Sequence, residues 1–353
     1  AVCLTMRVLH LTRDYPPRIN GGISVAVGGL VPALERAGVE CHVLSFDGWR
    51  PSRRRAAPTR PLTRAGRVAR LADGSQLEAA CALVETLACD VTHVHHPLLW
   101  RHAPASSARV FHVHVHLGAL DALRGVTTDS GRAEAEALAT ADAVIKPATW
   151  VGTRGEVIGF GVDATSPNPP VERDAATVLY AGRLGDVKGS RELLEAGRDV
   201  SAARPEAKLV IAGGLPDNPK AERRWRRRFA EAGQVEVTGW LPREQLWRRM
   251  AQATLLVAPS WHETFALAVR EAMLLGTPVV VGEVLGELVG DAGLVVPPRA
   301  ASTLAAALLR LLSDSALRRR LGDHAEAALG ALSWDEPARR VVDLYQRVTA
   351  TAE

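Results

Sequence analysis

The chain has 353 residues, of which 47% are hydrophobic and 23% charged, with a formal net charge of +4. This composition excludes a disordered or fibrous chain, and no apolar run reaches the roughly 18 residues that a membrane span needs. The length exceeds one ordinary hydrophobic core and suits two domains of about 150 residues each.

Short β-branched runs alternate with helical patterns in the first half of the chain. The predicted elements are a strand at 7–12, a helix at 23–38, strands at 39–46, 91–96, 109–115 and 143–148, and helices around 76–88 and 130–141. This order is that of βαβ units and indicates a parallel sheet. Because residues 7–12 already form a strand pattern, we expect Met6 to be the natural start and no signal peptide to precede it.

A proline-rich segment at 164–175 interrupts the alternation. Pro167, Pro169 and Pro170 cannot continue a helix or a central strand, so we interpret the segment as an interdomain linker. The predicted domains are then an N-terminal, acceptor-side domain at 6–165 and a C-terminal domain at 176–332, followed by a terminal helix at 333–353.

A second series of strands follows the linker. The predicted strands are 177–184, 208–214, 235–240, 255–260, 278–283 and 293–298. The fold class is therefore α/β, with two doubly wound Rossmann-like domains. Ligands of such domains bind at the carboxyl ends of the strands, so we expect the site in a cleft between two such edges.

The cysteines and the basic segments restrict the environment and the partners. Cys3, Cys41, Cys81 and Cys89 form no CxxC pair, and no HExxH spacing occurs, which argues against a disulfide framework or a zinc site and favours the cytoplasm. Residues 50–70 contain eight arginines and no acid, and 220–228 form a second basic run. Each is either solvated or attracts an anionic acceptor or a membrane surface, and no motif points to nucleic acid.

Two glycine-rich segments are candidate phosphate sites. Gly21 and Gly22 follow the first strand and open a helix, whose free N–H groups could hold a phosphate; a structural turn explains them equally well. Residues 159–164, GFGVDA, fit a dinucleotide fingerprint literally, but the prolines that follow forbid the helix this motif requires.

The segment 180–196, YAGRLGDVKGSRELLEA, contains a stronger anion signal. Arg183 ends a strand, Lys188 follows five residues later, and Ser190 is a good helix N-cap. Two cations beside a helix N-terminus suit a diphosphate, whereas a surface ion pair is the structural alternative. The spacing is not that of a Walker A loop.

Two glutamates lie in the segment 261–273, WHETFALAVREAM. On one continuous helix Glu271 would lie about 12 Å along the axis from Glu263 and about 80° round it. Carboxylates so placed can hold two hydroxyl-bearing parts of one elongated ligand, such as the ribose and the hexose of a nucleotide sugar. The alternatives are a helix-terminal charge for Glu263 and a solvated Glu271.

These segments together resemble the retaining glycosyltransferases of family 4, which have the GT-B fold. The resemblance covers residues 177–298 and includes the E-x7-E pattern; 19–38, 90–97, 111–118 and 333–347 match the family less tightly. It departs at Ala266, where the family usually has glycine, and at 159–163, which read GFGVD instead of a PNGVD-like segment.

The resemblance implies roles for the matching positions. Arg183 and Lys188 would bind the diphosphate, Glu263 the transferred sugar, and Glu271 the ribose. The backbone N–H groups of Phe265, Ala266 and Leu267 would lie near sugar and phosphate, Gly21 and Gly22 near the phosphate, and His116 near the reacting centre. Two alternatives stand equally for His93, His95 and His96: they are part of the core, or they line the acceptor cleft.

The predicted function is a metal-independent, retaining transfer of a sugar from a nucleoside-diphosphate donor to a hydroxylated acceptor, with a small natural product favoured. No cofactor is expected beyond the nucleotide-sugar co-substrate, the acceptor could be anionic, and peripheral membrane contact is an open alternative. The DxD metal motif is absent from the sequence. The alternatives are a sugar-nucleotide epimerase, a phosphorylase, or a non-catalytic nucleotide-sugar-binding module.

Overall fold

Two parallel sheets organise the chain, each at the centre of one structural unit. The computed structural model describes residues 6–19, 21–46, 63–65, 67–70, 77–162, 171–215, 218–329 and 332–350. Unit 1 comprises Ala1–Gly161 and Ser333–Glu353, and unit 2 comprises Val162–Leu332. The division thus falls at Gly161, before the predicted boundary at 165. Of the predicted linker at 164–175, residues 164–170 lie outside the described residues.

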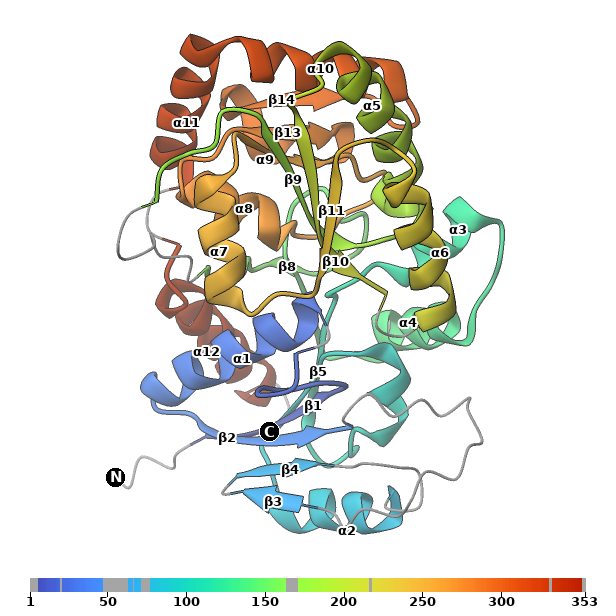
Figure 1. Cartoon of the computed structure of the whole chain (residues 1–353). Helices are drawn as coiled ribbons and strands as arrows, with labels where there is room; N and C mark the ends of the chain where they lie inside the picture. The colour runs from blue at the N-terminus through green and yellow to red at the C-terminus, as the bar shows by residue number, and fades with distance from the viewer. Residues whose placement is uncertain are drawn as a thin grey trace. The chain divides into compact units, whose positions relative to one another are not determined.

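Unit 1 is built on an eight-stranded sheet in the order β3-β4-β2-β1-β5-β6-β7-β8, parallel except for the β3–β4 pair (Figure 1). Its strands are β1 (Arg7–Thr12), β2 (Glu40–Ser45), β3 (Thr63–Ala65), β4 (Val68–Arg70), β5 (Val91–Val94), β6 (Ala108–His112), β7 (Ala143–Lys146) and β8 (Glu156–Val157). Its helices are α1 (Gly22–Arg36), α2 (Leu77–Leu87), the 3₁₀ helix η2 (Pro97–His102), α3 (Leu117–Arg124), α4 (Asp129–Thr140) and α12 (Asp335–Ala350).

Unit 2 has a six-stranded, fully parallel sheet in the order β11-β10-β9-β12-β13-β14. Its strands are β9 (Thr177–Arg183), β10 (Lys208–Gly214), β11 (Val235–Gly239), β12 (Leu255–Ala258), β13 (Val279–Gly282) and β14 (Gly293–Val296). Its helices are α5 (Ser190–Ala203), α6 (Pro219–Ala230), α7 (Arg243–Gln252), α8 (Leu267–Leu274), α9 (Gly286–Val289), α10 (Ala301–Ser313) and α11 (Ser315–Leu329), with the 3₁₀ helices η3 (Asp186–Lys188), η4 (Glu283–Leu285) and η5 (Gly290–Ala292). The prediction of two doubly wound sheets is confirmed.

Strands β9, β12 and β13 are buried on both faces, as the continuous apolar runs of a parallel sheet require. Helix α5 packs against α10, and α7 packs against α8, which covers the sheet with helices (Figure 1). The Arg173 guanidinium donates to the carbonyl of Ala253 and the hydroxyl of Thr277, both at 2.9 Å, and so ties the end of α7 to the segment after α8.

The terminal helix α12 belongs to unit 1 and packs against α1. Trp334 fills the space beside Gly29, where an added Cβ would meet its ring at 2.1 Å. The Arg36 guanidinium pairs with the Asp335 carboxylate at 2.8 Å, and the buried Tyr345 reaches the core. The apolar face of α12 therefore completes the first domain.

The arginine-rich stretch is only partly described. Arg50, Arg53, Arg54, Arg55 and Arg60 lie outside the described residues. At its end, the Arg70 guanidinium donates to the backbone carbonyls of Tyr15 at 3.1 Å and Pro16 at 2.5 Å. At least this arginine has an internal, structural role.

The second basic run forms helix α6. Trp225 and Phe229 are buried on one face, whereas Arg223, Arg224 and Arg227 are exposed on the other. Among the described residues, no helix combines the length and the apolarity needed to cross a membrane.

Candidate active site

The loop between β9 and α5 is tightly closed. Gly189 has a φ of +68°, and a Cβ there would meet the Pro259 carbonyl oxygen at 2.2 Å, so only glycine fits. The Gly185 N–H donates to the Ser190 hydroxyl at 2.9 Å. The predicted N-cap role of Ser190 is wrong: Ser190 is the first helical residue, and its hydroxyl closes the loop before the helix.

The loop between β12 and α8 contains Glu263. Ala266 adopts the left-handed conformation, with φ 58° and ψ 54°, and α8 begins only at Leu267. The prediction that Glu263 and Glu271 share one continuous helix is therefore wrong, and the helical estimate of their separation does not apply. The Arg270 guanidinium lies 4.2 Å from the centre of the Phe265 ring and donates to the Phe265 carbonyl at 3.2 Å.

A direct contact joins these two loops. Lys188 Nζ lies 2.5 Å from Glu263 Oε1, with the two side chains 31% and 17% exposed. The Trp261 N–H donates to the Val187 carbonyl at 2.8 Å, and the Ser260 hydroxyl donates to Glu263 Oε1 at 3.2 Å. Since β9 and β12 are adjacent, their carboxyl ends place an ammonium and a carboxylate side by side at the sheet edge.

Glu271 occupies a different environment. Its side chain is 2% exposed, so the alternative of a solvated carboxylate is wrong. The carboxylate pairs with the Arg243 guanidinium and accepts a hydrogen bond from Trp247 Nε1 at 3.1 Å. Arg243 and Trp247 are four residues apart and therefore on one face of α7. The i, i+4 spacing of Arg243 and Trp247 is the feature of the sequence that could have indicated a shared partner for these two side chains.

Arg183 ends β9 and is exposed. The Tyr180 hydroxyl donates to the Arg183 carbonyl, and the next N–H, that of Leu184, donates to Gly214 at 3.2 Å. The backbone that carries this guanidinium is thus fixed at the same sheet edge as Lys188.

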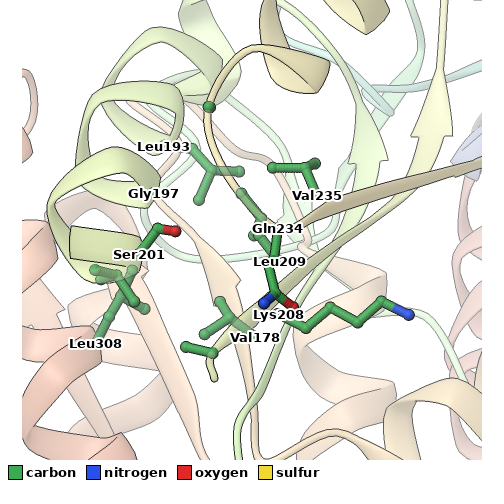
Figure 2. A pocket seen from close by; sticks show the side chains of 12 residues that line it. Val178, Leu193, Gly197, Ser201, Lys208, Leu209, Gln234, Val235 and Leu308 are labelled. Carbon is green, nitrogen blue, oxygen red and sulfur yellow. The ribbon is translucent and has the colours of Figure 1, made fainter. Parts of the chain in front are cut away.

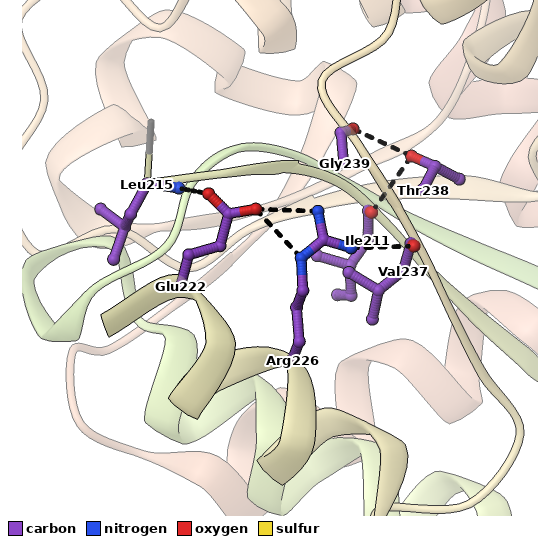
Figure 3. Close-up of polar contacts among 7 residues, drawn as sticks. All are labelled: Ile211, Leu215, Glu222, Arg226, Val237, Thr238 and Gly239. Carbon is purple, nitrogen blue, oxygen red and sulfur yellow. Dashed lines mark hydrogen bonds and ion pairs between the residues drawn. The ribbon is translucent and has the colours of Figure 1, made fainter. Parts of the chain in front are cut away.

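Helix α6 fixes the ends of β10 and β11 at this edge (Figure 3). The Glu222 carboxylate accepts hydrogen bonds from the Leu215 N–H at 2.8 Å and from the Arg226 guanidinium at 2.8 and 3.0 Å. Arg226 also donates to the Val237 carbonyl at 3.4 Å. Gly239, with φ +78°, lies so close that a Cβ would meet the guanidinium at 2.8 Å.

In unit 1, Gly21 precedes α1 and Gly22 is its first residue. A Cβ at either position would meet nothing within 4 Å, and neither has a φ that requires glycine. The fold itself therefore does not demand glycine at these two positions.

His116 directly precedes α3. Its Nδ1 lies 3.0 Å from Oε2 of the buried Glu134, which also accepts the N–H groups of Leu117 at 3.1 Å and Gly118 at 2.6 Å. The hydrogen bond to Glu134 raises the pKa of His116 above 6.5, against the opposing effect of burial. Glu134 thus fixes the ring and satisfies the start of α3.

The other histidines of the sequence analysis lie deeper. His93 and His95 are fully or almost fully buried, and burial lowers the pKa of each well below 6.5. His96 accepts the Leu98 N–H at 3.3 Å and caps η2, which ends the predicted strand early. The core alternative is therefore confirmed for His93 and His95.

A hollow in unit 2 lies at the opposite end of the strands (Figure 2). Val178, Lys208 and Val235, near the starts of β9, β10 and β11, line it together with Leu193 and Leu308. The hollow has room for about one water molecule and is too small for a nucleotide sugar.

Known proteins resemble this chain in sequence and in structure. Residues 175–314 match the family model of Glycosyl transferases group 1. D-inositol 3-phosphate glycosyltransferase of a Nocardioides species is 31% identical over 226 residues, which are 56% of this chain and 49% of the relative. Alpha-maltose-1-phosphate synthase of Mycolicibacterium smegmatis is 27% identical over 400 residues, with 98% of this chain and all of the relative covered.

Among solved structures, sucrose-phosphate synthase from Thermosynechococcus elongatus superposes with a TM-score of 0.78 at 21% identity, covering 98% of this chain and 100% of that one. At this identity the likeness concerns the fold alone. The chain spans about half the length of the first curated relatives it matches.

Proposed function

We propose that this protein, whose residues 175–314 form a glycosyl transferases group 1 domain on a GT-B fold, transfers a sugar from a nucleoside-diphosphate donor to a hydroxylated acceptor. The observation that carries the proposal is the contact of Lys188 with Glu263 at the carboxyl edge of the unit 2 sheet. The family match favours sugar transfer over the epimerase, phosphorylase and binding-module alternatives.

The donor would bind along this edge. Arg183 and Lys188 supply positive charge for the diphosphate, and the Glu263 carboxylate accepts hydrogen bonds from sugar hydroxyls. The N–H groups of Phe265, Ala266 and Leu267 lie at the start of α8, where a helix N-terminus favours an anion. Glu271 would hold the ribose hydroxyls, held in position by Arg243 and Trp247.

Retention and metal independence are part of the proposal. As the glycosidic bond breaks, negative charge grows on the leaving diphosphate, and the Lys188 ammonium and the α8 N-terminus stabilise it without a metal ion. The donor phosphate oxygen then accepts the acceptor's proton on the same face of the sugar. The role of His116 at the sugar, and those of Gly21 and Gly22 at the phosphate, stay predictions from the family resemblance.

We propose a small hydroxylated acceptor that carries an anionic group. The matching relatives are named for inositol phosphate and maltose phosphate, which are phosphorylated polyols or sugars. The basic segments at 50–70 and on α6 agree in charge with such an acceptor.

Donor screening tests the proposal. Thermal unfolding should be measured with UDP, GDP, dTDP and ADP sugars, because a ligand that binds the folded state stabilises it by RT ln(1 + [L]/Kd). The stabilising donor is then incubated with phosphorylated polyols, and the anomeric configuration of the product is read by NMR. Stabilisation without product would favour a binding module, and an altered sugar without acceptor would favour an epimerase.

Lys188→Ala should lose product formation, and Arg319→Ala, which changes an exposed cation on α11, is the matched control. Equal activity of the two variants would contradict the assignment of Lys188.

A further inference from the structure

Five histidine side chains lie together in the core of unit 1. They come from the carboxyl-terminal parts of three adjacent strands and the residues after them: His10 of β1, His93 and His95 of β5 and its end, and His112 and His114 of β6 and its end. Their exposed fractions range from 0% to 8%. The ring centres of His93 and His95 are 4.2 Å apart, and those of His112 and His114 are 4.3 Å apart.

Neutral imidazole accounts for their contacts with one another. A buried imidazolium would cost several kcal/mol, whereas a neutral ring offers one donor and one acceptor nitrogen. His95 Nε2 lies 3.0 Å from His10 Nδ1, and His95 Nδ1 lies 2.9 Å from His114 Nε2. His93 Nε2 lies 3.2 Å from His112 Nδ1. Neutral imidazole is also the form in which histidine binds metal ions.

Two nitrogens of this cluster are unsatisfied. His10 Nε2 and His112 Nε2 are both buried and have no hydrogen-bond partner among the described residues. An unsatisfied buried polar atom costs about 1–3 kcal/mol, so a native core rarely keeps one without a reason. His95, His112 and His114 each offer one nitrogen, and these three nitrogens lie within 4.8 Å of one another.

We propose that His95, His112 and His114 bind a late transition-metal ion of the Zn²⁺ class, through Nδ1 of His95 and Nε2 of the other two. Three imidazoles without a carboxylate select zinc, cobalt, nickel or copper over magnesium, calcium or manganese. Three protein ligands leave one coordination position for water or an exogenous ligand. The spacing of residues within single segments gave no sign of this site, because its ligands come from the ends of two strands, β5 and β6.

The ion would replace the contact between His95 Nδ1 and His114 Nε2, and the other hydrogen bonds suit these ligand atoms. With Nδ1 on the metal, His95 Nε2–H donates to His10. With Nε2 on the metal, His112 Nδ1–H donates to His93, whose Nδ1 lies 2.5 Å from the Tyr345 hydroxyl on α12. A partner on the second ring nitrogen is what orients histidine ligands in metal sites.

A second set, His10, His93 and His95, also brings three nitrogens within 4.8 Å. It would leave His112 Nε2 unsatisfied, as the first set leaves His10 Nε2. Its rings are at most 1% exposed, whereas His114 is 8% exposed and offers a route for the ion to enter. We therefore assign the metal to the set that contains the more accessible His114.

The experiment uses the full chain, with the metal alone as the probe. Protein freed of metal by a chelator is titrated with Zn²⁺ by calorimetry and with Co²⁺ by visible absorption. We expect one equivalent of tightly bound ion, tetrahedral Co²⁺ bands and a higher Tm with Zn²⁺. His112→Gln should weaken binding by more than about a hundredfold, since loss of a mere outer-shell partner already costs about 10–100-fold.

Two further variants separate the assignments. Tyr345→Phe removes only the hydroxyl that contacts His93, the partner of the ligand His112, and should weaken binding by about tenfold. His10→Gln should do the same here but abolish binding if the second set holds the ion. His324→Gln, on exposed α11, is the matched control and should bind normally.

X-ray absorption of the zinc-loaded wild type keeps the test decisive even if a variant fails to fold. Three imidazole nitrogens at about 2.0–2.1 Å are expected. A folded wild type that takes up no Zn²⁺, or a His112→Gln variant that binds it with unchanged affinity, would overturn the proposal. These readouts do not depend on sugar transfer.

Discussion

The Lys188 ammonium lies 2.5 Å from the Glu263 carboxylate, and this contact joins the loop after β9 to the loop after β12. The ammonium is only 31% exposed and is held by its ion pair with Glu263. A charge fixed in advance needs no reorganisation as the leaving group forms, which is the condition for strong transition-state stabilisation. The pair therefore links the fold to the proposed chemistry.

Lys188→Ala should reduce kcat much more than donor affinity. Removal of one preorganised electrostatic group typically costs about 10²–10³ in kcat, because the charge that it stabilises is largest in the transition state. Donor Kd, measured by calorimetry, should change by no more than roughly tenfold, and Arg319→Ala, on exposed α11, should match the wild type in both. A near-normal kcat would remove Lys188 from the mechanism.

The two glutamates should separate in their effects. Glu271→Gln should weaken binding of the free nucleoside diphosphate, whereas Glu263→Gln should leave that binding intact and harm turnover of the complete donor. Glutamine is preferable to alanine, since it keeps the volume beside Arg243 and Trp247, which hold the buried Glu271. Calorimetry with the free nucleoside diphosphate measures the affinity of each variant. If both variants bound it equally weakly, the proposed division of roles would be refuted.

Chelation should not stop sugar transfer. If positive side chains replace a metal, EDTA leaves the initial rate unchanged, and Mg²⁺ or Mn²⁺, which prefer oxygen ligands, adds nothing. If EDTA removes an ion from the histidine site of unit 1, the Tm should fall, and added Zn²⁺ should restore it. Inhibition by EDTA that Mg²⁺ or Mn²⁺ reverses would contradict the metal-independent mechanism.

The sequence was sufficient for the architecture because apolar runs and turn residues report local structure. Alternating βα patterns predicted both sheets, whereas the anion-binding role of the loop after β9 stays a prediction. It was insufficient for contacts between segments. Nothing in the spacing of Glu263 indicated that Lys188 would lie beside it, since that contact depends on β9 and β12 being neighbours in the sheet.

Helical periodicity also misled at one residue. The pattern from Thr264 to Leu274 is apolar at helical intervals, yet Ala266 is left-handed and the helix starts one residue later. An alanine at this position conceals the break, which a glycine would have signalled. The partners of Glu271 were missed for a related reason: Arg243 and Trp247 are on a different helix, 28 and 24 residues away.

Ala266→Gly should stabilise the protein. A left-handed conformation costs a non-glycine residue about 1–2 kcal/mol, part of which glycine loses again through the greater entropy of its unfolded chain. We expect a net gain of about 0.5–1 kcal/mol in the free energy of unfolding, measured by denaturant titration. Ala306→Gly, at an exposed position within α10, should instead lose about 1 kcal/mol. If both variants lost stability equally, the conformation of Ala266 would not be strained.

Glu192 should make stability depend on pH. This residue on α5 is buried, its Oε2 has no hydrogen-bond partner in the described part of the chain, and burial raises its pKa above 4.5. A raised carboxyl pKa means that the folded state holds its proton more tightly than the unfolded state. The resulting stability is fully present below pH 4.5 and is lost as pH rises through the folded pKa.

Glu192→Gln removes this charge at nearly constant volume. The variant should therefore be more stable than the wild type at pH 7 to 8, by on the order of 1 kcal/mol, and the difference should shrink toward pH 4.5. Chemical unfolding across this pH range measures it, with Glu195→Gln, an exposed position on the same helix, as the control. A difference between wild type and Glu192→Gln that stays constant with pH, or that matches the control, would show that folding does not shift the pKa of Glu192. A difference of opposite sign, with the wild type more stable at pH 7 to 8, would point to a partner that stabilises the charged form.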